Sequence, residues 1–247
     1  DRGDADLRGA ILPAADYVRL HGVGEALLLV HQVAGQHRRI GIVERVLGQH
    51  VNLQSFGIAG RLARNAPSVG AALRDLAAYF ILHDNGGSVG VSIHDGRVTM
   101  SYGIHVPGIR HWDHVYDLSV TTMLNVMRQL CGADWRPDAV LLPRKRPPDI
   151  RPYRDWFAAP LHFDSILAGI VFQERCLPQP IADADPLLHT LLQEKASVAM
   201  SRQDLPLHSD VRRTIRLLLM NKRCSRENVA RSLGLHPRTL GRRLQAT

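Results

Sequence analysis

The segment from Ser225 to Leu244 constrains the fold of this chain most, because it predicts two short helices joined by a tight turn. Ser225 is a favourable N-cap at the head of the first helix. Gly234 suits the left-handed backbone that ends such a helix, and His236-Pro237 opens the second one, where proline is tolerated in the first turn. Helical spacing predicts that the buried side chains of this unit are Val229, Ala230, Leu233 and Leu235.

The second of these helices carries arginines on the face opposite its apolar positions. Leu240 and Leu244 are four residues apart and are expected to face inward. Arginine pairs bidentately with guanine in the major groove, and its neighbours can hold phosphates, so the pattern predicts a DNA reader. The alternative is an amphipathic helix whose arginines are only solvated. The residues expected to face DNA are Arg226, His236, Arg238, Thr239, Arg242, Arg243 and Gln245.

Composition agrees with a globular, basic protein. The 247 residues are 45% hydrophobic and 22% charged, and the net charge of +8 favours a polyanionic partner, either nucleic acid or an anionic membrane surface. The three cysteines are widely separated, which argues against a disulfide framework and fits a reducing cytosol. We find no leader and no apolar run long enough for a bilayer, and therefore expect a cytoplasmic protein without membrane contact. The missing initiator Met suggests trimmed ends.

Helical and strand patterns interleave through the first 200 residues without a regular βαβ repeat, which favours an α+β domain. Two alternating runs about Asp95-Gly96 predict a hairpin. A long helix is expected from Trp112 to Leu130, with Val115, Leu118, Met123, Val126 and Met127 inward. The remaining expected elements are mostly helical structure in 1–55, helices near 63–83, 153–158 and 186–200, and strands at 139–142 and 168–172. Pro67-Ser68 marks the expected entry of the helical stretch near 63–83.

The polar stretch before Pro206 marks a predicted domain boundary. We expect a larger domain at 1–205, including the helix near 186–200, and a DNA-binding segment at 206–247. Paired readers roughly add their binding energies, so a homodimer is expected, with either the 112–130 helix or the 186–200 helix as its seam.

The residues from Arg226 to Leu244 resemble the first helix-turn-helix of the AraC/XylS family of bacterial regulators. The match is carried by Val229-Ala230, Leu233-Gly234-Leu235, Pro237-Arg238-Thr239-Leu240 and Arg242-Arg243-Leu244. The resemblance implies a transcription regulator that binds double-stranded DNA, and RNA polymerase as a partner if it activates. The family's reader has two such units, and this sequence holds only the first.

The larger part of the chain resembles the sensing domain of the ornithine- and virulence-type branch of that family, rather than the arabinose-binding jelly roll. The similar stretches are Phe56–Gly60, Ser68–Leu73, Tyr153–Phe157, Leu161–Phe163 and Ala182–Pro186. This resemblance implies effector sensing and dimerisation without naming the effector.

A basic, proline-rich loop at 143–154 departs from the family pattern. Its five cations, which prolines hold in place, suit an anionic small molecule. Arginine also recognises guanine and stacks on purines, and the loop is loosely similar to the paired arginines of PilZ-type receptors, so cyclic di-GMP is the first effector to test. The alternatives are a solvated basic surface or an extension of the DNA face. The predicted effector ligands are Arg144, Lys145, Arg146, Arg151 and Arg154.

Enzyme activity is not expected, because no phosphate loop, dinucleotide fingerprint or nucleophile elbow occurs. His105, His111 and His114 are the closest histidine group, but no Glu or Cys ligand accompanies them, so we expect no metal and no cofactor besides an effector. Three hypotheses remain open: a ligand-gated DNA regulator, a DNA-binding regulator whose large domain only dimerises or binds an apolar or other molecule, and an enzyme with a basic tail.

Overall fold

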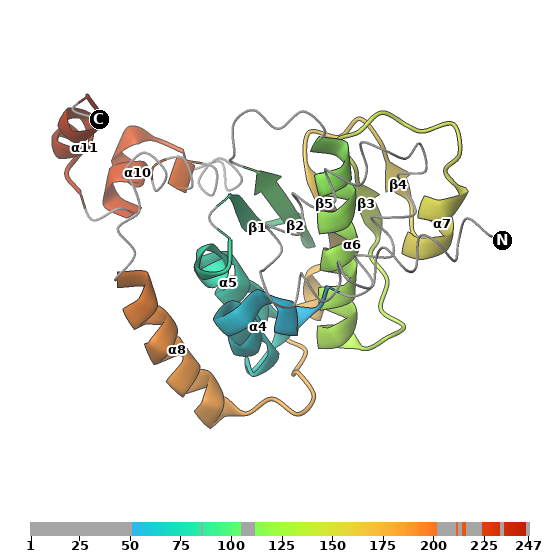
Figure 1. Cartoon of the computed structure of the whole chain (residues 1–247), viewed down its shortest axis with the longest axis horizontal. Helices are drawn as coiled ribbons and strands as arrows, with labels where there is room; N and C mark the ends of the chain where they lie inside the picture. The colour runs from blue at the N-terminus through green and yellow to red at the C-terminus, as the bar shows by residue number, and fades with distance from the viewer. Residues whose placement is uncertain are drawn as a thin grey trace, which may run out of the picture. The chain divides into compact units, whose positions relative to one another are not determined.

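The structure is a computed structural model, and Figure 1 shows its elements along the chain. It describes residues 51–84, 86–104, 112–201, 211, 214–215, 224–232 and 235–245. The helical structure expected in 1–50, His105, His111 and the predicted boundary at 205/206 lie outside these residues. The chain forms two compact units, Asp1–Ala196 and Ser197–Thr247.

The first unit combines helices with one mixed sheet, which confirms the predicted α+β class. Its helices are η1 (Leu53–Phe56), α4 (Gly57–Arg64), α5 (Val69–Tyr79), η2 (Phe80–Leu82), α6 (Trp112–Cys131), α7 (Arg151–Phe157), η3 (Glu174–Cys176) and α8 (Pro186–Ser201), whose last residues, from Ser197 on, belong to the second unit. Its strands are β1 (Gly87–His94), β2 (Arg97–Ile104), β3 (Ala139–Leu141), β4 (Leu161–His162) and β5 (Ala168–Gln173).

The sheet has the order β1-β2-β5-β3-β4, in which only the β3–β4 pair is parallel. The predicted hairpin is confirmed: His94 pairs with Arg97 across the turn. Asp95 and Gly96 have φ values of 50° and 72°, the left-handed backbone that a two-residue hairpin turn requires.

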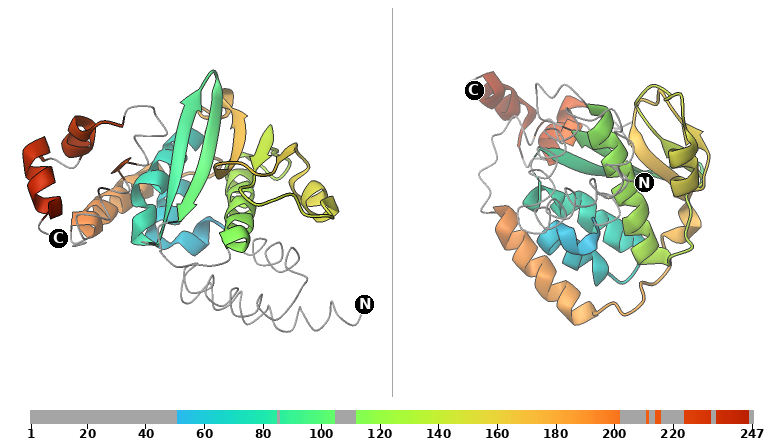
Figure 2. Two further views of the ribbon diagram at one scale, coloured as in Figure 1. Left: turned by 90° about the horizontal axis from the view of Figure 1, so that it is seen from above. Right: turned by 45° about the vertical axis from the view of Figure 1, so that its right-hand side comes forward.

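One face of the sheet is apolar and forms the core. Side chains two residues apart point to the same face, and the register aligns Val98 with Phe172 and Met100 with Ile170. Helices α5 and α6 pack against this sheet, and Figures 1 and 2 show α6 lying along it. The five side chains of α6 that were expected to face inward are all buried, which confirms that prediction: Val115, Leu118, Met123, Val126 and Met127.

Local chemistry fixes where several helices start. The Ser68 hydroxyl accepts a hydrogen bond from the Ala71 N–H at 3.3 Å and caps α5, as the Pro67-Ser68 pair predicts. Pro152 lies in the first turn of α7, which begins slightly earlier than expected, and Ala158 ends that helix with φ at 48°.

Candidate nucleic-acid interface and effector sites

The second unit holds the predicted pair of short helices, α10 (Arg226–Ser232) and α11 (Pro237–Gln245). The Ser225 hydroxyl accepts a hydrogen bond from the Asn228 N–H at 3.1 Å, so the predicted cap is confirmed. The Leu235 N–H donates to the Ala230 carbonyl at 2.8 Å and closes the connection between the helices. Pro237 occupies the first position of α11, where its missing N–H leaves no bond unmade.

A small apolar cluster holds the two helices together. Leu240 is 3% exposed and packs with buried residues of α10 and of the preceding helical residues. The expectation that Leu244 also faces inward is wrong, since its side chain is 38% exposed. Leu244 lies one turn beyond Leu240, and the cluster does not extend that far along α11. The members of the cluster are Val211, Val229, Ala230 and Leu240, with half-buried Ile215 and Leu235.

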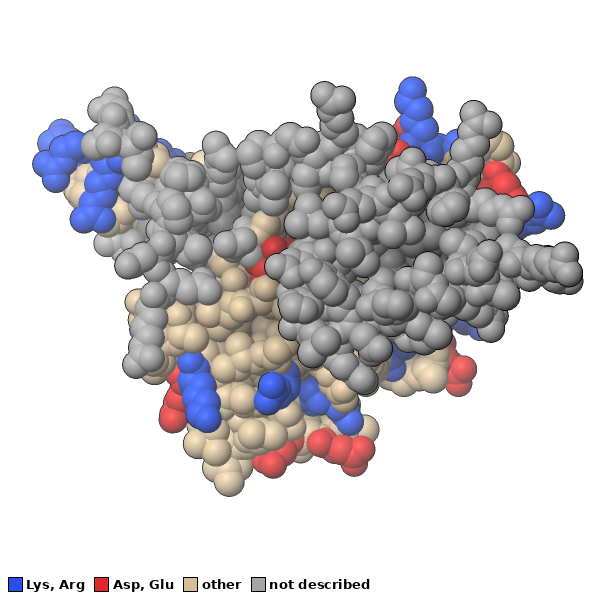
Figure 3. Space-filling model, in the orientation of Figure 1, with Lys and Arg blue, Asp and Glu red and all other residues tan. Residues whose placement is uncertain are grey.

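The outer face of α11 is basic. Arg238, Arg242 and Arg243 are exposed, as the pattern of the helix predicts, and Figure 3 shows basic side chains projecting where α11 lies in Figure 1. His236 is exposed and Thr239 half-buried, while the side chain of Gln245 is outside the described residues. A helix with an apolar inner face and adjacent exposed arginines has the form required to enter a major groove.

Arg226 has a different position from the arginines of α11. Its Nη2 donates to the carbonyl oxygen of Pro237 at 3.2 Å, so it links the start of α10 to the start of α11. A Cβ atom on Gly241 would come within 2.4 Å of that guanidinium nitrogen. Gly241 therefore leaves the space that this bracing contact needs.

The basic loop at 143–154 is divided between the core and the surface. Arg144 turns inward: its Nη1 donates to the Asp117 carboxylate on α6 and, at 2.6 Å, to the Tyr153 hydroxyl. The Tyr153 hydroxyl donates in turn to Asp117 at 2.6 Å. The side chains of Arg144 and Asp117 are only 17% and 6% exposed. Burial is the largest single influence and lowers the pKa of Arg144, but the Asp117 charge, the Tyr153 hydroxyl and the hydrogen bond to Asp117 together outweigh it, so the net pKa is raised.

The other four predicted effector ligands, Lys145, Arg146, Arg151 and Arg154, are exposed. Arg151 pairs with Asp149 at 2.8 Å, and its side-chain hydrogen bond lowers the pKa of that carboxyl to about 2. The structure therefore keeps most of the predicted basic surface, but it commits Arg144 to an internal ion pair.

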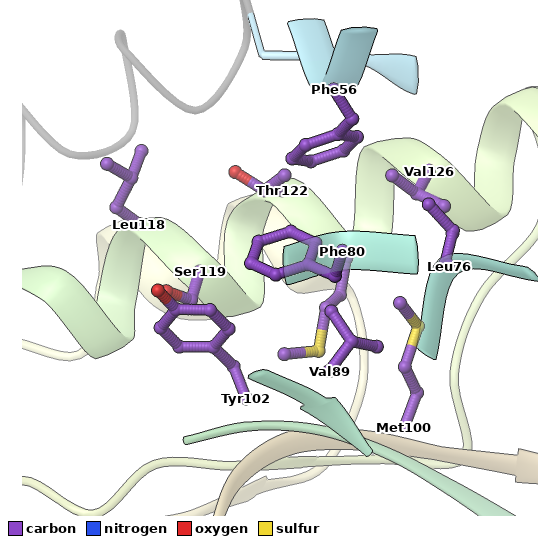
Figure 4. Close-up of a pocket in the computed structure, with 11 residues that line it drawn as sticks. Phe56, Leu76, Phe80, Val89, Met100, Tyr102, Leu118, Ser119, Thr122 and Val126 are labelled. Carbon is purple, nitrogen blue, oxygen red and sulfur yellow. The ribbon is translucent and has the colours of Figure 1, made fainter. Parts of the chain in front are cut away.

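An apolar pocket lies between α5, α6 and the β1–β2 hairpin. Figure 4 shows Phe80 between Phe56 and Tyr102. The ring centroid of Phe80 lies 5.7 Å from that of Phe56 and 5.9 Å from that of Tyr102. The cavity holds about 40 Å³, enough for a few water molecules, whereas ligand pockets span roughly 300–1,000 Å³. A metabolite could enter only if side chains such as Met100 or Met123 moved aside.

His83 packs beside this pocket, with its ring 5.2 Å from that of Phe56. Its Nε2 is buried and has no hydrogen-bond partner among the residues that the structure describes. Burial lowers the pKa of His83, so the neutral imidazole is the stable form near neutral pH.

Within the described part of the chain, no three His, Cys, Asp or Glu side chains come together as a metal site requires. Among those same residues, no helix has the length and apolar character needed to cross a bilayer.

Comparison with known proteins identifies the larger unit. A family model described as the arabinose-binding N-terminal domain of AraC transcription regulators matches residues 5–181. The HTH-type transcriptional regulator VirS, from two strains of Mycobacterium tuberculosis, is 28% identical over 198 residues, which is 78% of this chain and 58% of VirS. This chain thus spans little more than half the length of those relatives.

The fold is also found in a solved structure. The crystal structure of the transcriptional regulator CdpR from Pseudomonas aeruginosa matches with a TM-score of 0.58 and 20% sequence identity. The match covers 95% of this chain and 78% of that one. At this level of identity the likeness establishes the shared fold.

Proposed function

Because the chain belongs to the AraC family of transcription regulators, we propose that it binds DNA through α11 and responds to a small-molecule effector through its larger unit. The observation that carries this proposal is the exposed arginine face of α11, held on α10 by Leu240. Fold alone would not support it, since related folds serve many functions.

The arginines of the reader have separable roles under this proposal. Arg238 and Arg242 lie four residues apart on α11 and would contact base edges, while Arg243 would hold phosphate. Arg226 would act indirectly, because its contact with the Pro237 carbonyl positions α11. His236, Thr239 and Gln245 stay predicted DNA contacts beside them.

Binding to DNA selected from a random library tests these roles. Arg238→Ala or Arg242→Ala should each cost about 1–3 kcal/mol and relax the preference at one or two bases. Arg243→Ala should weaken all sequences alike and lower the salt slope by about 1. Arg97→Ala is the control, because it removes an exposed arginine from the hairpin. If the α11 variants bound the selected DNA as well as Arg97→Ala does, the reader assignment would be wrong.

A homodimer is the assembly that we propose, with α8 at its seam. The inner face of α6 is used by the core, whereas Leu187, Leu191 and Val198 of α8 are 70%, 48% and 50% exposed. These three residues recur on one side of the helix, so a second copy can cover them together. Sedimentation of the full chain should show dimers that Leu187→Lys/Leu191→Lys converts to monomers. A wild-type monomer at micromolar concentration would contradict the proposal.

An anionic effector remains the first candidate for the basic loop, and cyclic di-GMP the first compound. Lys145 and Arg146 are the residues to change, because Arg144 also stabilises the core. Calorimetry with cyclic di-GMP should show binding by wild type and a loss in Lys145→Gln/Arg146→Gln. Equal affinities would exclude this loop as the site. RNA polymerase stays a predicted partner if the protein activates transcription.

A further inference from the structure

A polar cleft beside α4 is a further cavity that the proposed function leaves unused. It holds about 630 Å³, which lies within the range of roughly 300–1,000 Å³ typical of ligand sites. Its polar lining consists of Gln54, Arg61, Arg64, Asn65 and Gln129. We refer to it as the α4 cleft.

Close backbone packing forms one wall of the α4 cleft. A Cβ atom on Gly60 would come within 1.6 Å of the Leu53 carbonyl oxygen, so only glycine lets η1 approach α4 this closely. The Leu53 N–H donates to Oε1 of Gln129 at 3.0 Å, which ties α6 to the same wall. That bond uses the amide oxygen of Gln129, and its NH₂ group makes no hydrogen bond to the described part of the chain, so it can donate to a ligand.

The described residues that line the α4 cleft give it a positive charge. Arg61 and Arg64 are exposed and lie three residues apart on α4, so both guanidinium groups start from one side of the helix. Among the described residues, neither has a carboxylate within 4.0 Å. Two arginines and an amide donor in a ligand-sized cleft suit a molecule with two or more anionic oxygens. We propose that the α4 cleft binds a small polycarboxylate or phosphorylated anion.

The α4 cleft is connected to the start of α8. The Nη1 of Arg64 donates to the Ala182 carbonyl at 3.2 Å, and Asn65 accepts from the Asp185 N–H at 3.2 Å. Asp185 caps α8, since its Oδ1 accepts from the N–H groups of Leu187 and Leu188 at 3.0 Å each. An anion that draws Arg64 to itself removes the bond to Ala182. Binding therefore loosens the segment that leads into α8, a regulatory consequence that rests on the proposed function.

Calorimetry on the full chain tests the binding step, with citrate as the carboxylate probe and pyrophosphate as the phosphate probe. Wild type should bind one of them, and Arg61→Gln/Arg64→Gln should bind it at least about tenfold more weakly, because two charge-assisted bonds are lost. Arg74→Gln is the control: it removes an exposed arginine from α5, outside the cleft. Circular dichroism checks that each variant folds. If the double variant unfolds, Arg61→Gln alone replaces it in the binding measurement.

Three outcomes would overturn the site: no heat from either probe at millimolar concentration, equal losses in Arg74→Gln, or a loss confined to Lys145→Gln/Arg146→Gln. The link to α8 has its own readout. Hydrogen exchange of residues 182–188 should rise when the probe binds to wild type, and an unchanged rate would refute the link while leaving the site. DNA binding is measured separately, so if the proposed DNA-binding role of α11 proved wrong, neither of these two results would change.

Discussion

The buried pair between Arg144 and Asp117 yields the sharpest stability prediction. Removing one partner of a buried ion pair typically costs about 3–5 kcal/mol, because the remaining charge stays desolvated. The Arg144 side chain keeps 17% exposure, so Asp117→Asn should fall near the lower limit, at about 3 kcal/mol. Tyr153→Phe removes a hydroxyl bonded to both charges and should cost about 2 kcal/mol.

Urea unfolding followed by tryptophan fluorescence measures these costs. The three tryptophans, Trp112, Trp135 and Trp156, all belong to the first unit, so the signal reports that unit alone. Arg151→Ala is a matched control, because it breaks an exposed pair in the same loop, where solvent screens the charges, and should leave the urea midpoint almost unchanged.

The alternative role of Arg144 makes a different prediction. As a ligand residue, it would affect cyclic di-GMP affinity more than stability. If Arg144→Ala were no less stable than Arg151→Ala while its affinity for the dinucleotide fell, the assignment of Arg144 to the core would be refuted. A stability loss of about 3 kcal/mol would also explain any loss of ligand binding by that variant as a folding defect.

Three further predictions follow from the first unit. His83→Phe should stabilise the chain increasingly as the pH falls below 6.5, because the lowered folded-state pKa of His83 makes protonation favour the unfolded state; urea midpoints across that range test the trend. Partial burial raises the pKa of half-buried Cys131 to about 12, so Cys131 should react far more slowly with a thiol reagent at neutral pH than exposed Cys224, and equal rates would contradict that partial burial. Gly60→Ala should cost about 3 kcal/mol or more in urea unfolding, because its methyl group would overlap the Leu53 carbonyl; an unchanged midpoint would contradict this packing.

Local chemistry was enough to predict much of the fold. The Asp95-Gly96 turn, the Ser68 and Ser225 caps and the apolar spacing of α6 each act over a few residues, and each matches the structure. Strand β4 was missed because two residues carry no detectable alternation. Its pairing with β3 depends on the rest of the sheet rather than on its own sequence.

The site was predicted less completely, because charge in a sequence does not show where a side chain points. Arg144 belongs to a run of cations, yet its partner Asp117 is 27 positions away and could not be inferred from that run. The α4 cleft was missed because it joins Arg61 and Arg64 to Gln129 of a distant helix. The only available signal was the pair of arginines one turn apart, directly after the glycines of α4.

Helix α8 is the element through which the proposed activities would meet. The Nε2 of His189 on α8 lies 2.8 Å from Oδ2 of Asp75 on α5, and both side chains are largely buried. The adjacent residue on α5, Leu76, lines the apolar pocket, while the cap of α8 contacts Asn65. The exposed leucines of the proposed dimer seam lie on the same helix.

A ligand can shift an equilibrium only by its differential affinity for two states. An effector would therefore have to bind better when one of the contacts that attach α8 to the rest of its unit is altered. The Arg64 contact with Ala182 meets that requirement, because an anion in the α4 cleft competes for the same guanidinium group.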